Sequence, residues 1–87
     1  SGLLDMALES GHVIKPSNGW YSRVDKETGE VEDKKYRIKD TDTKDFWAPI
    51  ITSKSFQEWV KSNYQIASGS LITTDESIEE ELRAIAD

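Results

Sequence analysis

Residues 12–24 read HVIKPSNGWYSRV, and this segment sets the architecture on both sides of it. Pro16 forces the residue before it out of the helical region, so a short extended piece is expected at 12–15. Asn18-Gly19 indicates a turn, because this pair tolerates a positive φ. Residues 20–24 alternate and are rich in strand formers, which predicts a strand directly after the turn.

A second strand candidate, at 31–38, follows a polar loop. Tyr36 and Ile38 fall on one of its faces. Alternation puts the basic side chains on the other face, namely Lys35, Arg37 and Lys39. We therefore expect a β-hairpin over 20–38, joined by Val13-Ile14 as the third strand of a small antiparallel sheet.

Helices are expected before and after this sheet along the chain. Leucines and alanines share one face of residues 2–10, and Gly11 follows as a left-handed stop. Thr43 or Asp42 can cap a short helical turn at 44–48, which Pro49 ends or begins. Ser55 and Glu58 have the spacing of a capping box, so another helix is expected to start there. Its apolar stripe consists of Phe56, Trp59, Val60, Tyr64 and Ala67. The predicted fold class is α+β, with a small antiparallel three-stranded sheet, a preceding helix, one or two following helices and a C-terminal acidic helix.

The composition excludes several classes of protein. The 87 residues contain no cysteine and one histidine. Disulfides, thiolate metal sites, a cysteine nucleophile and a two-histidine metal motif are therefore ruled out. No apolar run approaches the ~18 residues of a membrane span. These features predict a soluble module from a reducing compartment, with a small core in which aromatic residues carry much of the packing.

The net charge of -6 is unevenly distributed along the chain. Residues 1–67 are nearly neutral, whereas residues 68–87 contain six acidic side chains and one basic side chain. This asymmetry predicts a body at 1–67 followed by a linker and an acidic tail at 68–87.

The tail has the pattern of a short amphipathic helix. Its apolar residues recur at i, i+4 and i+7, namely Ile78, Leu82 and Ile85. Glu76 belongs to a capping box at 73–76, and acidic residues fill the other side of the helix, namely Glu79, Glu80 and Glu81. A helix of this length is marginal alone, so the stripe is expected to pack on the body, on a symmetry mate or in the groove of a partner.

Catalytic and metal-binding patterns are weak. His12 has Ser10 and Ser22 as plausible neighbours, but no nucleophile elbow surrounds them, and a structural role is favoured. Asp40 and Asp42 lack the glycine and distal glutamate of a calcium loop, and helix capping explains them better. We therefore expect no catalytic residues, no metal site and no enzymatic activity in this chain.

Basic and aromatic residues suggest nucleic-acid binding. Four positive charges lie within residues 34–39 and would meet a phosphate backbone if they shared one strand edge. The alternative is an ordinary solvated strand face balanced by Glu30, Glu32 and Asp33. Five aromatic residues are candidates for base stacking or for the core, namely Trp20, Tyr21, Trp47, Trp59 and Tyr64. Core packing is favoured for Trp47 and Trp59, whereas Trp20 and Tyr21 remain open.

Several motifs carry a family resemblance. The runs LLDMA at 3–7, VIKP at 13–16 and NGWY at 18–21 closely resemble the start of the C-terminal domain of UvsX-type proteins. These are the RecA-family recombinases of T-even-type phages. The resemblance continues through DKETGE at 25–30, KDT at 39–41 and FWAP at 46–49, and it covers about residues 1–67. The C-terminal domain of bacterial RecA is similar more distantly, through WYS at 20–22 and Trp47.

The resemblance implies that the chain is one domain of a larger protein. The parent would be a DNA-dependent ATPase that uses ATP and Mg²⁺, forms filaments on single-stranded DNA and exchanges strands in recombination, repair and recombination-dependent replication. It would act in the cytoplasm of the infected host cell. This domain would engage double-stranded DNA, and its acidic tail would temper that engagement. No cofactor is expected in the domain itself.

Candidate DNA contacts combine the basic run with the family's basic turns. They are Lys15, Asn18, Lys34, Lys35, Arg37, Lys39 and Lys44. The alternative is a protein-interaction module whose tail stripe docks a recombination mediator, a helicase or a single-strand-binding protein.

Overall fold

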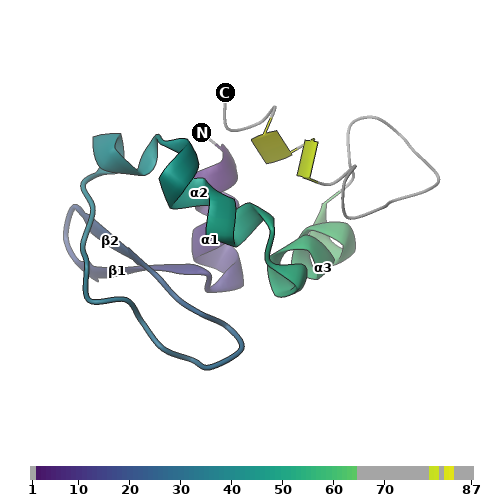
Figure 1. Ribbon diagram of the computed structural model, residues 1–87, viewed down its shortest axis with the longest axis horizontal. Coiled ribbons are helices and arrows are strands. Elements are labelled where there is room, and N and C mark those ends of the chain that lie inside the picture. The colour runs from purple at the N-terminus through teal and green to yellow at the C-terminus, as the bar shows by residue number, and fades with distance from the viewer. Residues whose placement is uncertain (1, 65–78, 81, 84–87) are drawn as a thin grey trace.

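The computed structural model describes residues 2–64, 79–80 and 82–83. Its elements in chain order are α1 (Gly2–Ser10), β1 (Val13–Ser17), β2 (Trp20–Arg23), the 3₁₀ helix η1 (Ile38–Thr41), α2 (Lys44–Ile51) and α3 (Lys54–Asn63). Residues 79–80 and 82–83 are also helical. The hairpin lies at one end of the molecule and α3 at the other, with α1 and α2 between them (Figure 1). The fold class is therefore α+β, as the sequence predicts.

The α1 helix has the predicted bounds. Its buried face consists of Leu3, Leu4, Met6 and Ala7. Gly11 follows with a φ of 80° and donates its N–H to the carbonyl of Leu8. Glycine adopts this left-handed conformation without the steric penalty of a Cβ, so the helix ends there and the chain turns into β1.

The sheet in the described part of the chain has two strands rather than the predicted three. β1 and β2 pair antiparallel through the turn at Asn18 and Gly19, with a register shift between Ile14 and Ser17. Residues 31–38 contribute only two isolated bridges, Tyr21 with Tyr36 and Val24 with Val31. Two residues separate Tyr21 from Val24, whereas four separate Val31 from Tyr36, so the two segments do not form a continuous ladder.

Side chains replace the missing ladder. The carboxylate of Glu32 accepts the backbone N–H of Arg23, and the hydroxyl of Ser22 donates to the carbonyl of Lys34 at 2.9 Å. The prediction of a strand running to Ile38 was therefore wrong. Ile38 instead begins η1 and is 59% exposed, and Lys39 lies in that 3₁₀ helix.

The α2 helix is longer than expected. Thr43, rather than Asp42, is its N-cap, and its hydroxyl accepts the N–H of Phe46 at 3.1 Å. The helix continues to Ile51 with Pro49 inside it, so proline neither ends nor begins it. Phe46, Trp47 and Ile50 are buried on its inner face, which stabilises the helix through tertiary packing despite the proline.

The α3 helix begins one residue before the predicted cap. Ser53 is the N-cap, with its hydroxyl 3.4 Å from the N–H of Phe56. Ser53 has the extended backbone that a cap requires, whereas Ser55 already lies inside the helix. On the predicted stripe, Phe56 and Val60 are buried and Trp59 is half-buried, but Tyr64 is 40% exposed. Ala67 lies outside the described residues.

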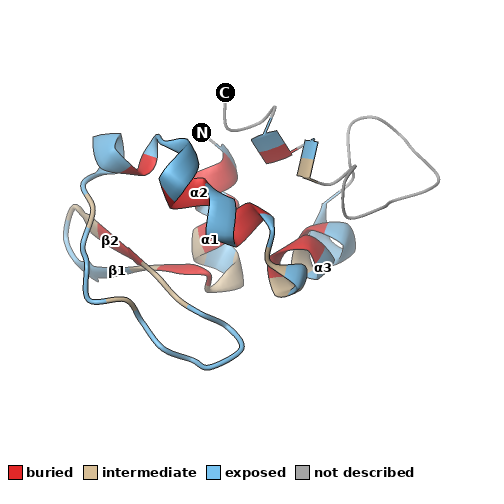
Figure 2. Cartoon of the chain, in the orientation of Figure 1, coloured by how far each residue is buried: buried red, intermediate tan, exposed pale blue. Residues whose placement is uncertain are grey.

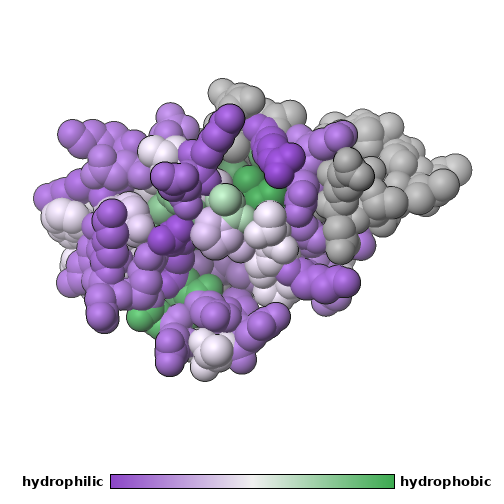
Figure 3. All heavy atoms as spheres, in the orientation of Figure 1, coloured by the Kyte–Doolittle hydropathy of each residue, from purple (hydrophilic) through white to green (hydrophobic). Residues whose placement is uncertain are grey.

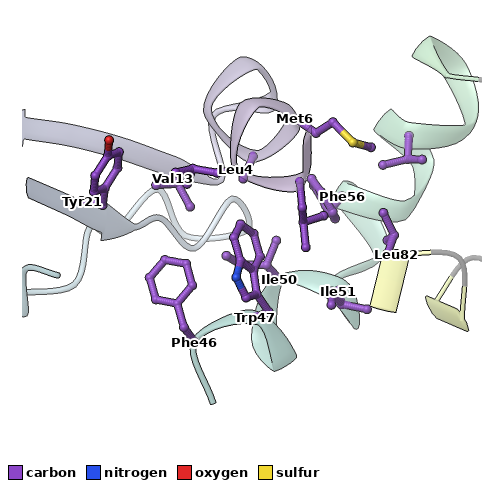
Figure 4. Packing of buried hydrophobic residues seen from close by; sticks show 13 residues of the cluster. Leu4, Met6, Val13, Tyr21, Phe46, Trp47, Ile50, Ile51, Phe56 and Leu82 are labelled. Atoms are coloured by element: carbon purple, nitrogen blue, oxygen red, sulfur yellow. The ribbon is translucent and has the colours of Figure 1, made fainter. Parts of the chain in front are cut away.

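Buried positions occur in α1, the hairpin, α2 and α3 (Figure 2), and hydrophobic residues from all four form one cluster among the described residues. Tyr21 and Val13 come from the hairpin, Phe46 and Trp47 from α2, and Phe56 from α3 (Figure 4). The rings of Phe46 and Trp47 meet edge to face with centroids 5.0 Å apart. Trp47 is therefore a core residue, and the half-buried Trp59 packs against the same cluster, as predicted.

Candidate nucleic-acid interface

The β1–β2 hairpin positions the candidate interface. Asn18 and Gly19 form its turn, and Gly19 has a φ of 81°. Successive side chains of β2 point to opposite faces of the hairpin. Tyr21 therefore turns toward the core, where it is buried, and Trp20 lies on the other face and is half-buried.

The candidate DNA contacts are exposed side chains on several elements. Lys15 lies in β1, Asn18 in the turn, Lys39 in η1, and Lys44 is the first residue of α2. The others belong to the irregular segment at 31–37, namely Lys34, Lys35 and Arg37. Within the described part of the chain, the basic side chains of this set form no ion pair with a carboxylate.

The structure brings three of these cations onto neighbouring aromatic rings. The Nζ of Lys15 lies 5.6 Å from the ring centroid of Tyr21, and the Nζ of Lys34 lies 4.9 Å from that of Tyr36. Tyr21 and Tyr36 are bridge partners, so these two cations share one region of the hairpin. The guanidinium of Arg37 lies 4.0 Å from the centroid of Trp20. Such contacts restrain the cations without neutralising them.

Lys35, Lys39 and Lys44 are not held in this way. Lys35 and Lys39 follow the same exposed segment into η1, which contacts β2. Lys44 instead lines a groove of about 640 Å³ beside α2, together with Trp47, Ile51 and Arg83. Lys44 thus shares a groove with Arg83, one of the described residues of the tail.

Arg23 is a residue of the site that sequence reasoning missed. Its guanidinium pairs with Glu32 at 2.8 Å and donates to the hydroxyl of Tyr36 at 2.9 Å. It also donates to the carbonyls of Asp45 and Phe46 at 3.2 and 3.1 Å. One side chain therefore fixes β2, the basic segment and α2 relative to one another. Alternation with Tyr21 on β2 was the available signal, since it places Arg23 on the inner face.

The ion pair changes the charge balance of the interface. The hydrogen bond to Glu32 is the main cause that raises the pKa of Arg23, against the opposing effect of burial. Burial raises the pKa of the Glu32 carboxyl, but its bonds to Arg23 outweigh burial and lower that pKa overall. Glu32 is therefore bound to Arg23 and does not balance the exposed lysines. Of the three acidic residues expected to balance them, Glu30 and Asp33 are exposed.

Two residues of the tail are placed against the body. Leu82 is fully buried in the core (Figure 4), and Glu79 accepts a hydrogen bond from the Nε2 of Gln57 at 3.3 Å. Glu80 is exposed. The other tail candidates, Glu76, Ile78, Glu81 and Ile85, lie outside the described residues. A partner that took Leu82 would have to remove it from the core.

His12 has a structural environment. It is 3% exposed, and its Nδ1 and Nε2 lie 2.8 and 2.7 Å from the hydroxyls of Ser10 and Ser55. Ser10 is the predicted neighbour, whereas the other is Ser55 rather than Ser22, because Ser22 bonds to Lys34. Burial, and secondly the charge of Lys26, lowers the pKa of His12.

Other kinds of site find little support in the described residues. Among residues 2–64, 79–80 and 82–83, no three His, Cys, Asp or Glu side chains are placed to hold a metal ion. No helix in those ranges has the length and apolar character needed to cross a membrane. The face shown in Figure 3 is mostly hydrophilic, with small hydrophobic areas.

Comparisons with known proteins agree with the family resemblance. Residues 1–60 match the family model described as bacteriophage T4 recombination and repair protein, C-terminal domain. The chain is also similar to the recombination and repair protein of Enterobacteria phage T4, with 46% identity over 86 residues. That match covers 94% of this chain and 21% of the relative, so the chain spans about a fifth of the relative's length.

Proposed function

The chain belongs to the family of C-terminal domains of the phage T4 recombination and repair protein, and on that premise we propose that it binds duplex DNA in recombination and repair. The supporting observation is the group of exposed cations held on aromatic rings, Lys15, Lys34 and Arg37. Lysine and arginine side chains that neutralise phosphates release counterions, which supplies a sequence-independent binding free energy.

The proposed binding mode grips the backbone of the duplex. Lys15 and Lys34 lie on bridged tyrosines, so two charges are presented from adjoining segments. Lys35, Arg37 and Lys39 extend the charged surface toward η1. Phosphate contacts of this kind position a protein on DNA and carry no sequence information. Sequence matching would then be left to strand pairing elsewhere in the longer protein.

The longer protein would supply the chemistry. Because the T4 relative is several times longer than this chain, we place ATP hydrolysis, Mg²⁺ binding and filament formation on single-stranded DNA outside the present residues. Recombination mediators, helicases and single-strand-binding proteins are its proposed partners. Its place of action would be the cytoplasm of the infected cell.

The acidic tail is proposed to regulate this surface. Glu79 and Leu82 dock on the body, and Arg83 lines the same groove as Lys44. Carboxylates of the tail would compete with DNA phosphates for Lys44 and, through their long-range field, for the other basic residues, and salt would screen that competition. Replacing Glu79, Glu80 and Glu81 together by glutamine retains Leu82 and should raise the affinity for duplex DNA.

A salt titration tests the proposal. Binding of a fluorescent 20-bp duplex to the 87-residue chain is measured by anisotropy between 20 and 200 mM NaCl. Removing one side chain that neutralises a phosphate should reduce the slope of log K against log[salt] by about 0.9. Lys15→Ala plus Lys34→Ala should lower the slope by roughly two such steps. Lys26→Ala is the matched control, because Lys26 lies near His12 rather than on the aromatic pair.

The outcomes separate the alternatives. If the wild-type chain does not bind the duplex even at 20 mM salt, or if the double variant binds with an unchanged slope, the proposed grip is wrong. Unchanged affinity in the glutamine triple variant would count against tail competition while leaving the grip intact.

A further inference from the structure

Two arginines lie over aromatic rings, Arg23 in β2 and Arg37 in the segment at 31–37, and their hydrogen bonding differs. Arg23 lies 5.3 Å from the ring centroid of Tyr36 and 5.2 Å from that of Phe46. Its donors are directed to Glu32, the hydroxyl of Tyr36 and two helix carbonyls. Each nitrogen of its guanidinium therefore donates within the protein, so Arg23 holds the fold together.

Arg37 makes the shorter ring contact, with its guanidinium 4.0 Å from the centroid of Trp20. Among the described residues it has neither a hydrogen bond from its side chain nor an ion pair. The side chain is exposed, so its donors and one face of the guanidinium are open to solvent.

The turn of the hairpin helps to hold Arg37 in place. A Cβ atom at Gly19 would lie 3.1 Å from Nη1 of Arg37, which shows how closely the guanidinium crosses the turn. Gly19 therefore serves both the positive φ of the turn and the space for the arginine. The turn approaches the guanidinium at Nη1 and the indole lies beneath it, so its position is restrained before any ligand arrives.

A flat cation held on an indole is suited to a further flat ring. Unpaired nucleobases stack on aromatic side chains and on arginine guanidinium planes. The ammonium groups of the neighbouring lysines are point charges suited to phosphates, and they lack the flat surface of a guanidinium. The Trp20–Arg37 pair thus offers something that Lys15 and Lys34 do not.

We propose that Trp20 and Arg37 form a stacking site for an unpaired nucleobase, which lies on the outer face of the guanidinium. This inference rests on the proposed DNA-binding function and deepens it, since the neighbouring lysines would hold the phosphates of the same DNA. The domain would then prefer DNA that presents unpaired bases beside a duplex over a fully paired end.

The test compares two probes that have the same phosphates. Both are 20-bp duplexes with a three-nucleotide single-stranded extension, which contains adenines in one and abasic sites in the other. Base stacking on such platforms supports an expected preference of about tenfold for the adenine probe. Arg37→Lys retains the charge, so it should keep the affinity for the abasic probe and its salt slope while reducing the preference to about twofold or less.

Two further variants complete the test. Trp20→Leu should remove the preference in the same way as Arg37→Lys, with folding checked by circular dichroism and thermal unfolding. Lys35→Ala is the matched control, because no ring contact holds Lys35, and it should weaken binding to both probes equally. The affinities for a ten-nucleotide adenine strand and for its abasic counterpart are also compared. This comparison uses single strands and does not depend on duplex binding.

Equal wild-type affinity for adenine and abasic probes would overturn the stacking site, as would full preference retained in Arg37→Lys. In those cases phosphate contact alone explains Arg37. Failure of the proposed duplex grip would be seen separately, as an absence of binding to a blunt duplex while the preference between the two single strands persists.

Discussion

Arg23 donates a hydrogen bond from Nη1 to the backbone carbonyl of Asp45, 3.2 Å away. In a regular helix this carbonyl would accept the N–H of the residue four positions later, but Pro49 occupies that position and has no N–H. A residue of the hairpin therefore satisfies the acceptor that the proline leaves open. This bond helps α2 to tolerate an internal proline, together with burial of the helix face, and it ties the hairpin to the helix.

This relationship predicts coupling between Arg23 and Pro49. In Pro49→Ala the new N–H can satisfy Asp45, so Arg23→Ala should then destabilise the fold less than it does in the wild type. The expected coupling free energy is about 0.5–1 kcal/mol. Urea unfolding of the two single variants and the double variant measures it. Strict additivity would show that the carbonyl is not shared.

The Arg23–Glu32 pair predicts an acid-dependent part of stability. Because the folded state lowers the pKa of Glu32, its contribution is present above the unfolded pKa, near 4.5, and is lost as pH falls through the folded value. Glu32→Gln should lower the free energy of unfolding at pH 7 by about 1–3 kcal/mol and flatten this dependence below pH 4.5. Glu30→Gln, at an exposed site, is the control. A variant with the wild-type acid profile would contradict the assignment.

His12 predicts a second dependence on pH. Its pKa is lowered in the folded state from 6.5, mainly by burial, so the folded state favours the neutral ring. Stability should be complete above pH 6.5 and should decrease as pH falls below it, because the unfolded chain binds the proton more tightly. His12→Asn should remove that decrease below pH 6.5 in urea titrations. Lys26→Ala should reduce it, since Lys26 also disfavours the charged ring. An unchanged slope in His12→Asn would disprove the link.

Leu82 predicts that the tail contributes to stability. Truncating a fully buried leucine to alanine typically costs about 2–5 kcal/mol, and Leu82 is fully buried. Its exposed neighbour Arg83 is the matched control, and Arg83→Ala should change stability by no more than about 0.5 kcal/mol. Thermal unfolding distinguishes the two. If Leu82→Ala unfolds like the wild type, the leucine does not belong to the core in solution.

Replacing Gly19 or Gly29 by alanine should have different effects on the surroundings of Trp20. Both have a φ near 80°, so alanine at either should cost about 1–2 kcal/mol of stability. Only at Gly19 does the new Cβ meet the side chain of Arg37, whereas Gly29 has nothing within 4 Å. NMR shifts of the Trp20 indole should therefore move in Gly19→Ala and stay in Gly29→Ala. Identical spectra around Trp20 would show that Arg37 does not cross the turn.

Local patterns determined much of this fold. The bounds of α1 follow from its apolar face and Gly11, and the β1–β2 turn follows from Asn18-Gly19. These features depend on residues within one turn of one another, where backbone preference dominates. The core roles of Trp47 and Trp59 also followed from periodicity, and the family followed from short motifs at 3–7 and 18–21.

Two of the failed predictions involve competition between distant groups. Residues 31–38 have strand periodicity, but bonds from Ser22 and Arg23 to that segment interrupt its pairing. Pro49 stops a helix by local rules, yet here burial of the helix face and the donor from Arg23 sustain it.

The sequence by itself determined the α+β class, the turn of the hairpin and the position of the basic residues along the chain. Only the tertiary structure decided that Glu32 pairs with Arg23, that Leu82 enters the core and that Arg37 rests on Trp20 with its donors open. The reason is physical: charge and periodicity are properties of neighbouring residues, whereas the choice of a charged side chain's partner depends on which distant surfaces the packed core brings together.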